Sequence, residues 1–411
     1  MRQSRDSYVW ILGGGQLQIP NILCAKELGY KTIVTDQNKN CICKKKANLF
    51  FCVDIFDIQK NISLLKKLKK KYSIKSIFVG GIDCTVTQAC LAKQLNLVSS
   101  GISCAKLTNN KYLFRKFLHK KNISNIPFMK ILKTSNGLIK KVENKIGYPF
   151  IIKNVDNSAS RGIEIITKKI DSKQFDGYVN SAIKASRCGY CIIEKYYRGK
   201  EYTVETLFDV RGNFHPCFIT ERYFNHSKGK ALETGLRNPS KLEPYKVKKI
   251  FKFAEFVARK VGIKVGPAKF DLLISNNKLI ILEMTTRLSG GFDCQYLVPA
   301  ATGKNVIKAA MLTALGEEFN SELLKNKFNK VAMTSSVWPK PGKIKKITYK
   351  KVKIKKNEYL KVFFTKKKND LIQNYENCAD RACFIIAASA NEKKTNYLIN
   401  KAKNNIKINT T

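Results

Sequence analysis

The stretch PAKFDLLISNNKLIILEMTTRLSGG, residues 267–291, places two apolar runs on either side of Asn276 and Asn277. Asparagine accepts the left-handed backbone of a tight turn, so the stretch predicts a β-hairpin turned at these residues. Pairing about that turn brings Asp271 beside residue 282 or 283, and Glu283 ends the second run. Adjacent carboxylates repel each other unless a cation lies between them, and Mg²⁺ prefers oxygen ligands. The stretch therefore predicts a magnesium site on Asp271 and Glu283, with a structural salt-bridged pair as the alternative.

The residues after Glu283 extend this candidate site. Arg287 follows four residues later and offers a guanidinium to phosphoryl or acyl-phosphate charge. Gly290 and Gly291 have no side chains, so the backbone there can approach a substrate closely. We therefore expect Ser289 and Gly290 to contact substrate.

Composition limits the classes of partner. The 411 residues exceed one compact core, so two or three domains are expected. The net charge of +47 would suit nucleic acid, but only 12 of the 77 basic residues are Arg, the residue best suited to phosphate and base recognition. The Lys residues are spread along the whole chain, so we expect no nucleic-acid partner. The 13 Cys, without a signal-peptide pattern or a membrane-length apolar run, indicate a reduced cytoplasmic protein that binds no membrane.

The order of apolar segments predicts three domains. In residues 1–107 short apolar runs alternate with amphipathic helices, which indicates an α/β domain with a doubly wound parallel sheet. Residues 108–330 combine antiparallel strands with helices and are expected to be α+β. Residues 331–411 are predicted to form a small β-rich domain with one terminal helix.

A glycine turn follows the first predicted strand. ILGGGQLQIP, residues 11–20, is where a dinucleotide-binding loop would lie, and Asp36 ends the next strand as a ribose-binding acid would. The third glycine of that fingerprint is replaced by Gln18. Free N–H groups near Gly14 and Gln16 could bind a nucleotide or the carboxylate or phosphate of a substrate. A tight turn with no ligand is the alternative.

Two further stretches suggest phosphate and nucleotide contacts. In FIIKNVDNSASRG, residues 150–162, Lys153 ends a strand and faces a loop of small residues that could cover phosphates. In IIEKYYRGKEYTVE, residues 192–205, Glu194 ends an apolar strand and Glu201 begins the next. Such an edge could offer backbone groups to adenine and a carboxylate to ribose. A solvated lysine and an ordinary edge strand are the alternatives.

An acceptor site is expected between these stretches and the hairpin. TERYFNHSKGKALETGLRNPSKL, residues 220–242, carries Arg222, His226, Glu233 and Arg237 in a loop-like context. An amino-acid substrate needs an anion for its ammonium group and a cation for its carboxylate. We expect Glu233 and Arg237 to supply them, with a solvated polar loop as the alternative.

Taken together, these stretches resemble the ATP-grasp superfamily of carboxylate–amine ligases. The motifs that carry the resemblance are GGGQLQ, GYPFIIK with SRG, IIEKYYRGKEY and FDLL with LEMTTR. The resemblance covers nearly the whole chain and implies a doubly wound domain, a two-lobed ATP-grasp domain and a small C-terminal cap. Within this superfamily, the chain resembles most the branch of the purine-synthesis carboxylases and carbamoyl-phosphate synthase.

The resemblance implies a role for each matching residue. Phosphates would be bound by Lys111, Lys153 and the loop residues Ser160, Arg161 and Gly162. The nucleotide would also contact Glu194, Lys195, Tyr197 and Glu201. Asp271, Glu283 and Thr285 would ligate metal, and Arg287 with Lys153 would act in catalysis. Gly14, Gln16, Ser289 and Gly290 would contact substrate. The chain departs from the family at Thr285, where the family usually has Asn, a stronger Mg²⁺ ligand.

The implied reaction is ATP-dependent formation of a C–N bond. A carboxylate would be phosphorylated to an acyl phosphate, and an amine would then displace phosphate. Small molecules would be the partners, ATP with Mg²⁺ or Mn²⁺ the cofactors, and the resemblance allows a homodimer. A nicotinamide-dependent oxidoreductase that uses the glycine turn and Asp36 is one alternative. A non-catalytic ATP-binding relative is the other, because of Thr285.

Overall fold

The computed structural model describes residues 6–157, 161–227, 229–375 and 377–411. The N-terminal domain contains a four-stranded sheet of order β3-β2-β1-β4 in which neighbouring strands run parallel. Its strands are β1 (Ser7–Leu12), β2 (Lys31–Thr35), β3 (Leu49–Phe51) and β4 (Ser73–Phe78). The helices between them are η1 (Gln16–Gln18), α1 (Ile19–Glu27) and α2 (Ile58–Leu68), and α3 (Thr85–Gln94) follows β4.

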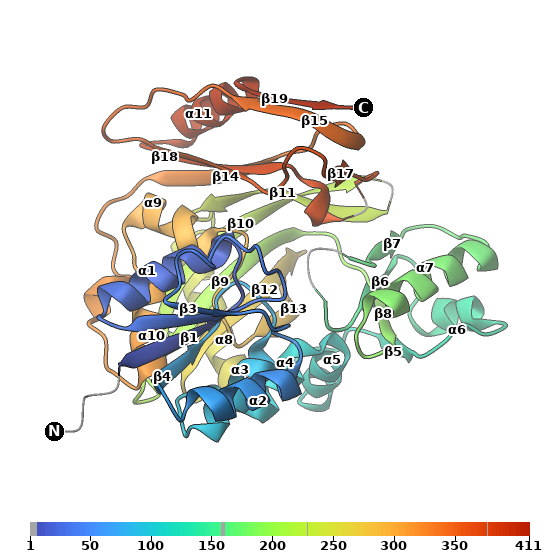
Figure 1. Ribbon diagram of the computed structural model, residues 1–411. Helices are drawn as coiled ribbons and strands as arrows, with labels where there is room; N and C mark the ends of the chain where they lie inside the picture. The colour runs from blue at the N-terminus through green and yellow to red at the C-terminus, as the bar shows by residue number, and fades with distance from the viewer. Residues whose placement is uncertain (1–5, 158–160, 228, 376) are drawn as a thin grey trace.

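Both faces of this sheet are buried, as its apolar strands predict. Val9 and Ile11 of β1 pack with α1, whereas Tyr8, Trp10 and Leu12 pack in the cluster that contains residues of α2 and α3. Figure 1 shows α1 on one side of the sheet and α2 on the other. The prediction of a doubly wound domain is confirmed.

A small lobe follows two connecting helices, α4 (Ile102–Asn109) and α5 (Lys111–Lys120). Its antiparallel sheet has the order β5-β8-β6-β7. The strands are β5 (Phe128–Ile131), β6 (Phe150–Asn154), β7 (Glu164–Ile166) and β8 (Cys191–Lys195). Helices α6 (Leu138–Lys145) and α7 (Ser172–Ala185) share its apolar core, and the lobe projects to the right in Figure 1.

A larger antiparallel sheet forms the second lobe. Its strands are β9 (Lys200–Phe208), β10 (Phe214–Ser227), β11 (Lys230–Asn238), β12 (Gly266–Ser275) and β13 (Lys278–Thr285). Helix α8 (Pro244–Val261) packs its apolar face on β9 and β12, and Gly262 ends it in the left-handed conformation. Near this sheet follow η2 (Asp293–Leu297), α9 (Val298–Thr302), α10 (Val306–Leu315) and η3 (Ser321–Leu324).

The hairpin predicted from the opening stretch is confirmed. Asn276 and Asn277 both have positive φ, 46° and 59°, as a tight turn between twisted strands requires. The register pairs Asp271 with Glu283 and Lys269 with Thr285. The two predicted carboxylates are therefore direct neighbours across the hairpin.

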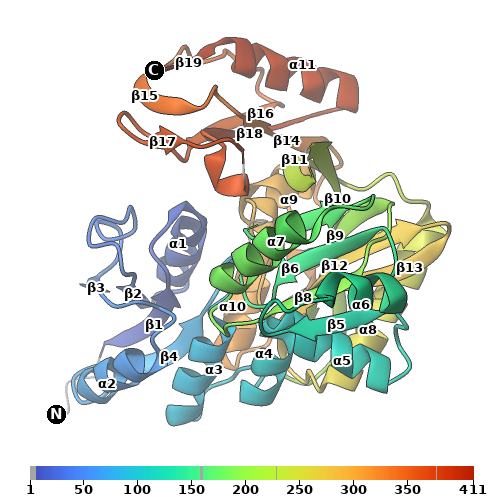
Figure 2. The same cartoon turned by 90° about the vertical axis from the view of Figure 1, so that its right-hand side faces the viewer.

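The C-terminal segment continues the large sheet. β14 (Val331–Val337) pairs with β11, so the sheet runs β13-β12-β9-β10-β11-β14-β18-β16. The remaining elements are β15 (Gly342–Tyr349), β16 (Tyr359–Phe364), β17 (Leu371–Ile372), η4 (Cys378–Asp380), β18 (Cys383–Ser389), α11 (Glu392–Asn404) and β19 (Ile406–Thr410). Figure 2 shows this unit as the uppermost layer. The expected β-rich cap is confirmed, while the boundaries at 107 and 330 stay predictions.

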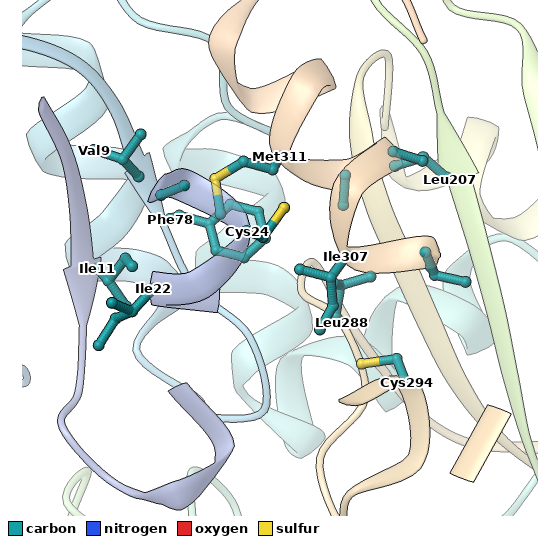
Figure 3. Close-up of a cluster of buried hydrophobic side chains, with 14 of the residues drawn as sticks. Val9, Ile11, Ile22, Cys24, Phe78, Leu207, Leu288, Cys294, Ile307 and Met311 are labelled. Atoms are coloured by element: carbon teal, nitrogen blue, oxygen red, sulfur yellow. The ribbon is translucent and has the colours of Figure 1, made fainter. Parts of the chain in front are cut away.

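A shared apolar core fixes the N-terminal domain against the large lobe. Val9, Ile11 and Ile22 from the first domain pack in one buried cluster with Leu288, Ile307 and Met311 from the second (Figure 3). Within the part of the chain that the structure describes, no helix combines the length and apolarity needed to span a bilayer. The fused core matters for function because it holds loops of the N-terminal domain beside the large sheet.

Candidate active site

A cavity of about 330 Å³ lies where the small lobe, the large sheet and a loop of the N-terminal domain meet. Its walls include residues of β6, β9, β10, β11, β12 and β13. The predicted site residues that line it are Lys111, Lys153, Glu201, Glu233, Asp271, Glu283, Arg287, Ser289 and Gly290. Residues as far apart in sequence as Lys111 and Gly290 therefore share one cavity.

Lys153 lines the cavity, and the buried carboxylate of Glu194 holds its ammonium in place. Its Nζ lies 2.5 Å from Glu194 Oε1, and Arg115 Nε lies 2.9 Å from Glu194 Oε2. Burial would raise the pKa of Glu194, but Arg115 and Lys153 outweigh it and lower that pKa to about 2. The buried Glu194 is thus engaged by two cations and does not line the cavity, in contrast to its expected role as a nucleotide contact.

Arg115 was missed by the sequence reasoning. It lies on α5 among the apolar residues Phe114 and Leu118, and it is 2% exposed. Its guanidinium also donates to the carbonyl oxygen of Ile281 at 2.9 Å. A basic residue on the apolar face of an amphipathic helix was the available signal, because such a charge needs a buried partner.

Lys111 begins α5 at the edge of the cavity. Asn110 caps the helix by accepting from Leu113 N, and Lys111 N donates to Val155 O at 2.8 Å. Its Nζ donates to Asn157 O at 2.9 Å and lies 3.6 Å from Glu283 Oε2. The side chain therefore connects the loop after β6 to the hairpin carboxylate.

The two hairpin carboxylates differ in their partners. Asp271 Oδ2 lies 2.5 Å from Lys269 Nζ, and Asp271 Oδ1 lies 3.1 Å from Arg222 Nη1. Glu283 Oε1 lies 3.8 Å from the same Lys269 Nζ, and its side chain is 28% exposed. Burial would raise the pKa of Glu283, but Lys111 and Lys269 lower it below its usual range. Both carboxyl groups line the cavity.

The hairpin fits a divalent ion in part. Glu283 presents a partly accessible carboxylate whose ion pairs with Lys111 and Lys269 are long, at 3.6 and 3.8 Å, which suits Mg²⁺. Asp271 is engaged by Lys269 and Arg222. The Thr285 hydroxyl is buried and has no hydrogen-bond partner among the described residues. Glu283 is therefore the residue best placed to hold a metal, and Asp271 and Thr285 stay predicted ligands.

Arg287 joins the large lobe to the N-terminal domain. Its Nη2 and Nε lie 2.5 and 2.7 Å from Asp83 Oδ1, in the loop that follows β4. Gly81 N donates to Leu288 O at 3.0 Å, which ties the same two segments through the backbone. A Cβ at Gly290 would lie 3.2 Å from Gly81 O. Asp83 orients the predicted catalytic guanidinium, and sequence spacing offered no sign of this pair.

Glu205 supports the backbone at Ser289, a predicted substrate contact. Ser289 N donates to Glu205 Oε2 at 2.7 Å, and both residues are buried. Burial raises the pKa of Glu205 to about 7. No role was predicted for Glu205 from the sequence. Its partner across the sheet is Lys269 of β12, which lies directly opposite it.

The predicted acceptor loop is wrong in its conformation. Residues 220–227 and 230–238 belong to the antiparallel hairpin of β10 and β11, and both strands contribute residues to the cavity wall. Glu233 lines the cavity and lies 2.9 Å from Arg222 Nη2, while Arg222 Nη1 lies 3.3 Å from Glu201 Oε2. Arg237 pairs instead with Glu392 of α11 at 3.2 Å, away from the cavity lining.

Gly14 and Gln16 lie at a second cavity of about 530 Å³. Gly14 N donates to Asp36 Oδ2 at 2.7 Å, and Gln16 Nε2 donates to Phe364 O at 3.0 Å. Asp36, the carboxylate that would bind the ribose of a dinucleotide, thus accepts a hydrogen bond from the backbone of the glycine turn. Gly291 and Arg381 line both cavities, so the two are adjacent.

Of the remaining predicted nucleotide contacts, those that the structure describes do not line the first cavity. Lys195 Nζ donates to Tyr148 O at 2.6 Å, and Tyr197 is half-buried in the connection between β8 and β9. Arg161 Nη1 donates to Asn157 Oδ1 at 3.0 Å, and Gly162 adopts φ +58°. Ser160 lies outside the described residues.

Comparison with known proteins identifies the central region. A family model described as an ATP-grasp domain matches residues 146–295, which include β6 to β13. The chain contains an ATP-grasp domain. The expected resemblance is confirmed over the segment that carries Lys153, Glu194, Asp271 and Glu283.

Individual relatives extend the likeness beyond the ATP-grasp domain. An N5-carboxyaminoimidazole ribonucleotide synthase from Staphylococcus aureus is 24% identical over 78% of this chain and 85% of its own length. The Staphylococcus epidermidis enzyme of that name is 26% identical over 46% of each chain. The structure of an L-amino acid ligase from Bacillus licheniformis superposes with a TM-score of 0.80 at 18% identity and covers all of both chains. The comparisons confirm the expected fold and the expected class, an ATP-grasp ligase.

Proposed function

We propose that this protein uses MgATP to activate a small carboxylate as an acyl phosphate and couples it to an amine. The observation that carries the proposal is the convergence of Lys111, Lys153 and Arg287 with Glu283 around one cavity of an ATP-grasp domain. Cations on three sides suit the phosphates of ATP, and the carboxylate suits the metal that accompanies them.

The chain's own residues divide the work of such a reaction. Lys153, held by Glu194, and Lys111, held by Asn157, bind phosphate oxygens. Glu283 would hold Mg²⁺, which supplies neutralisation of phosphate charge. Arg287, oriented by Asp83, stabilises charge on the group that is transferred. The carboxylate oxygen attacks the γ-phosphorus as ADP leaves, and the amine then attacks the acyl carbon as phosphate leaves.

The second cavity supports a site for the carboxylate or the amine. It adjoins the first at Gly291 and Arg381 and contains the glycine turn with Gly14 and Gln16. Its walls also include apolar side chains such as Ile42 and Phe292. A partly apolar small molecule with one anionic group therefore fits it, and a homodimer stays a prediction.

Release of phosphate from ATP tests the proposal. MgATP is offered with pairs of amino acids and small carboxylates, and phosphate is measured with each component omitted in turn. Phosphate should appear only when a carboxylate and an amine are both present. Glu283→Gln should lower the rate by about 10- to 100-fold or more, because loss of even an outer-shell partner of a metal has an effect of that size. Turnover like that of the parent would contradict the proposal.

A further inference from the structure

A buried lysine lies between the two carboxylates of the β12–β13 hairpin. Lys269 precedes Asp271 by two residues, so both side chains leave the same face of the sheet, while Phe270 points into the core. Lys269 is 6% exposed, and its Nζ lies 2.5 Å from Asp271 and 3.8 Å from Glu283. The ammonium thus lies where a cation bridging the two carboxylates would be expected.

Asp271 has little capacity left for a metal. Its Oδ2 bears the Lys269 contact, while Oδ1 accepts from Thr203 Oγ1 at 3.3 Å and lies 3.1 Å from Arg222 Nη1. All three partners are buried or nearly so, which makes their displacement costly. A divalent ion beside Asp271 would have to displace the Lys269 ammonium from the Asp271 carboxylate.

The charges around the hairpin point the same way. Lys111 lies beside Glu283 and Lys269 beside Asp271, so each hairpin carboxylate already has a lysine partner, and Arg222 also reaches Asp271. A divalent ion placed beside Asp271 would add positive charge where the Lys269 ammonium already neutralises the carboxylate. Opposite Lys269, Thr285 offers a single buried hydroxyl, which is a weaker metal ligand than a carboxylate.

We propose that the Lys269 ammonium is a built-in cation of the nucleotide site, which takes the position beside Asp271 and leaves room for one divalent ion, on Glu283. This inference rests on the proposed nucleotide-dependent function. Lys269 pairs with Asp271 on one side and is available to a phosphate oxygen on the other. The chain thereby binds its nucleotide with a single divalent ion.

Counting bound Mn²⁺ tests the inference without turnover. The full chain is titrated with Mn²⁺ and the non-hydrolysable ATP analogue AMP-PNP, free Mn²⁺ is measured by electron paramagnetic resonance, and bound analogue is measured separately. The wild-type chain should hold one Mn²⁺ per bound analogue. Two Mn²⁺ per bound analogue would overturn the role of Lys269 and leave the proposed function standing, whereas failure to bind the analogue would overturn both.

Substitutions at Lys269 test whether its ammonium sets the number of Mn²⁺ ions bound per analogue. Lys269→Met removes the ammonium and should raise the count from one Mn²⁺ to two, whereas Lys269→Arg keeps a cation and should hold one. Lys304→Met is the matched control, because Lys304 is half-buried and donates to Cys217 O outside the cavity. The Lys304→Met variant should also bind one Mn²⁺ per bound analogue. An unchanged count in folded Lys269→Met would overturn the proposal, and if that variant does not fold, the wild-type count decides.

Discussion

The ammonium of Lys153 is held by the buried carboxylate of Glu194, at a distance of 2.5 Å between Nζ and Oε1. Arg115 holds the other carboxylate oxygen, so three side chains from α5, β6 and β8 form one buried cluster. The phosphate-binding lysine predicted from the sequence is therefore anchored through a network inside the small lobe.

Replacing Glu194 should weaken the fold in a pH-dependent way. The pKa of Glu194 is about 2 in the folded chain against an ordinary value of 4.5, so the ionised form stabilises the folded state. Because the folded pKa is depressed, this stability is complete above pH 4.5 and is lost as the pH falls toward 2. Glu194→Gln should cost about 3 kcal/mol at pH 7.

Urea unfolding from pH 7 down to pH 3 measures this effect. The difference between wild type and Glu194→Gln should shrink steadily below pH 4.5. Glu322→Gln is the control, since its partner Lys325 and Glu322 itself are both exposed. A difference that stays constant with pH would contradict the assignment.

Lys153 and Lys195 should differ in their effect on nucleotide binding. Lys153 lines the cavity, whereas Lys195 Nζ is bonded to backbone oxygens of Gly147 and Tyr148. Loss of a charged hydrogen bond to phosphate costs about 1.5–3 kcal/mol, so Lys153→Met should weaken MgADP binding roughly 10- to 100-fold. Calorimetric titration should find Lys195→Met close to wild type, and equal losses in both variants would refute the distinction.

The pair between Asp83 and Arg287 should matter for both stability and rate. Arg287 is buried, so Asp83→Asn leaves its charge with weaker compensation and should cost about 3 kcal/mol. The phosphate-release rate should fall at least about 10-fold, since the guanidinium loses its orienting partner. Glu318→Gln removes an exposed arginine pair and should change neither quantity by much. Wild-type behaviour of Asp83→Asn would argue against a role for the domain junction.

Gly14 should tolerate no side chain, unlike Gly177. A Cβ at Gly14 would lie 2.4 Å from Cys41 Sγ, so Gly14→Ala must distort the turn beside the second cavity. A Cβ at Gly177, inside α7, meets no atom within 4 Å, and Gly177→Ala should stabilise the chain by up to about 1 kcal/mol. Thermal unfolding and the KM for the carboxylate or amine measure both effects. An unchanged KM in Gly14→Ala would contradict a role of the glycine turn in substrate binding.

Local patterns predicted most of the fold. The hairpin at Asn276 and its register follow from turn chemistry and strand periodicity, which operate over a few residues. Lys153 and Glu283 were predicted as site residues for the same reason, since each follows an apolar run at a recognisable motif, and both line the first cavity. The β10–β11 hairpin was mistaken for a loop because its turn near residue 229 lies within a long polar segment.

The partners of these residues could not be predicted in the same way. Asp83 is 204 residues from Arg287, and Arg115 is 79 residues from Glu194, so only the tertiary fold brings them together. Arg237 was expected at the substrate and instead bonds Glu392 of α11. Arg115 and Lys269 had local signals, since Arg115 lies on the apolar face of α5 and strand periodicity puts Lys269 on the same face as Asp271.

The pairing of β14 with β11 makes the C-terminal segment a structural part of the ligase lobe. Ending the chain at residue 330 would strip β11 of its neighbour and expose the backbone groups of Arg237 and Asn238 along an open edge. Open edges of this kind recruit strands from other molecules and drive aggregation. Residues 331–411 therefore act as the closing strands of the sheet that carries the active-site carboxylates, and a shortened chain would be expected to lose solubility before it lost chemistry.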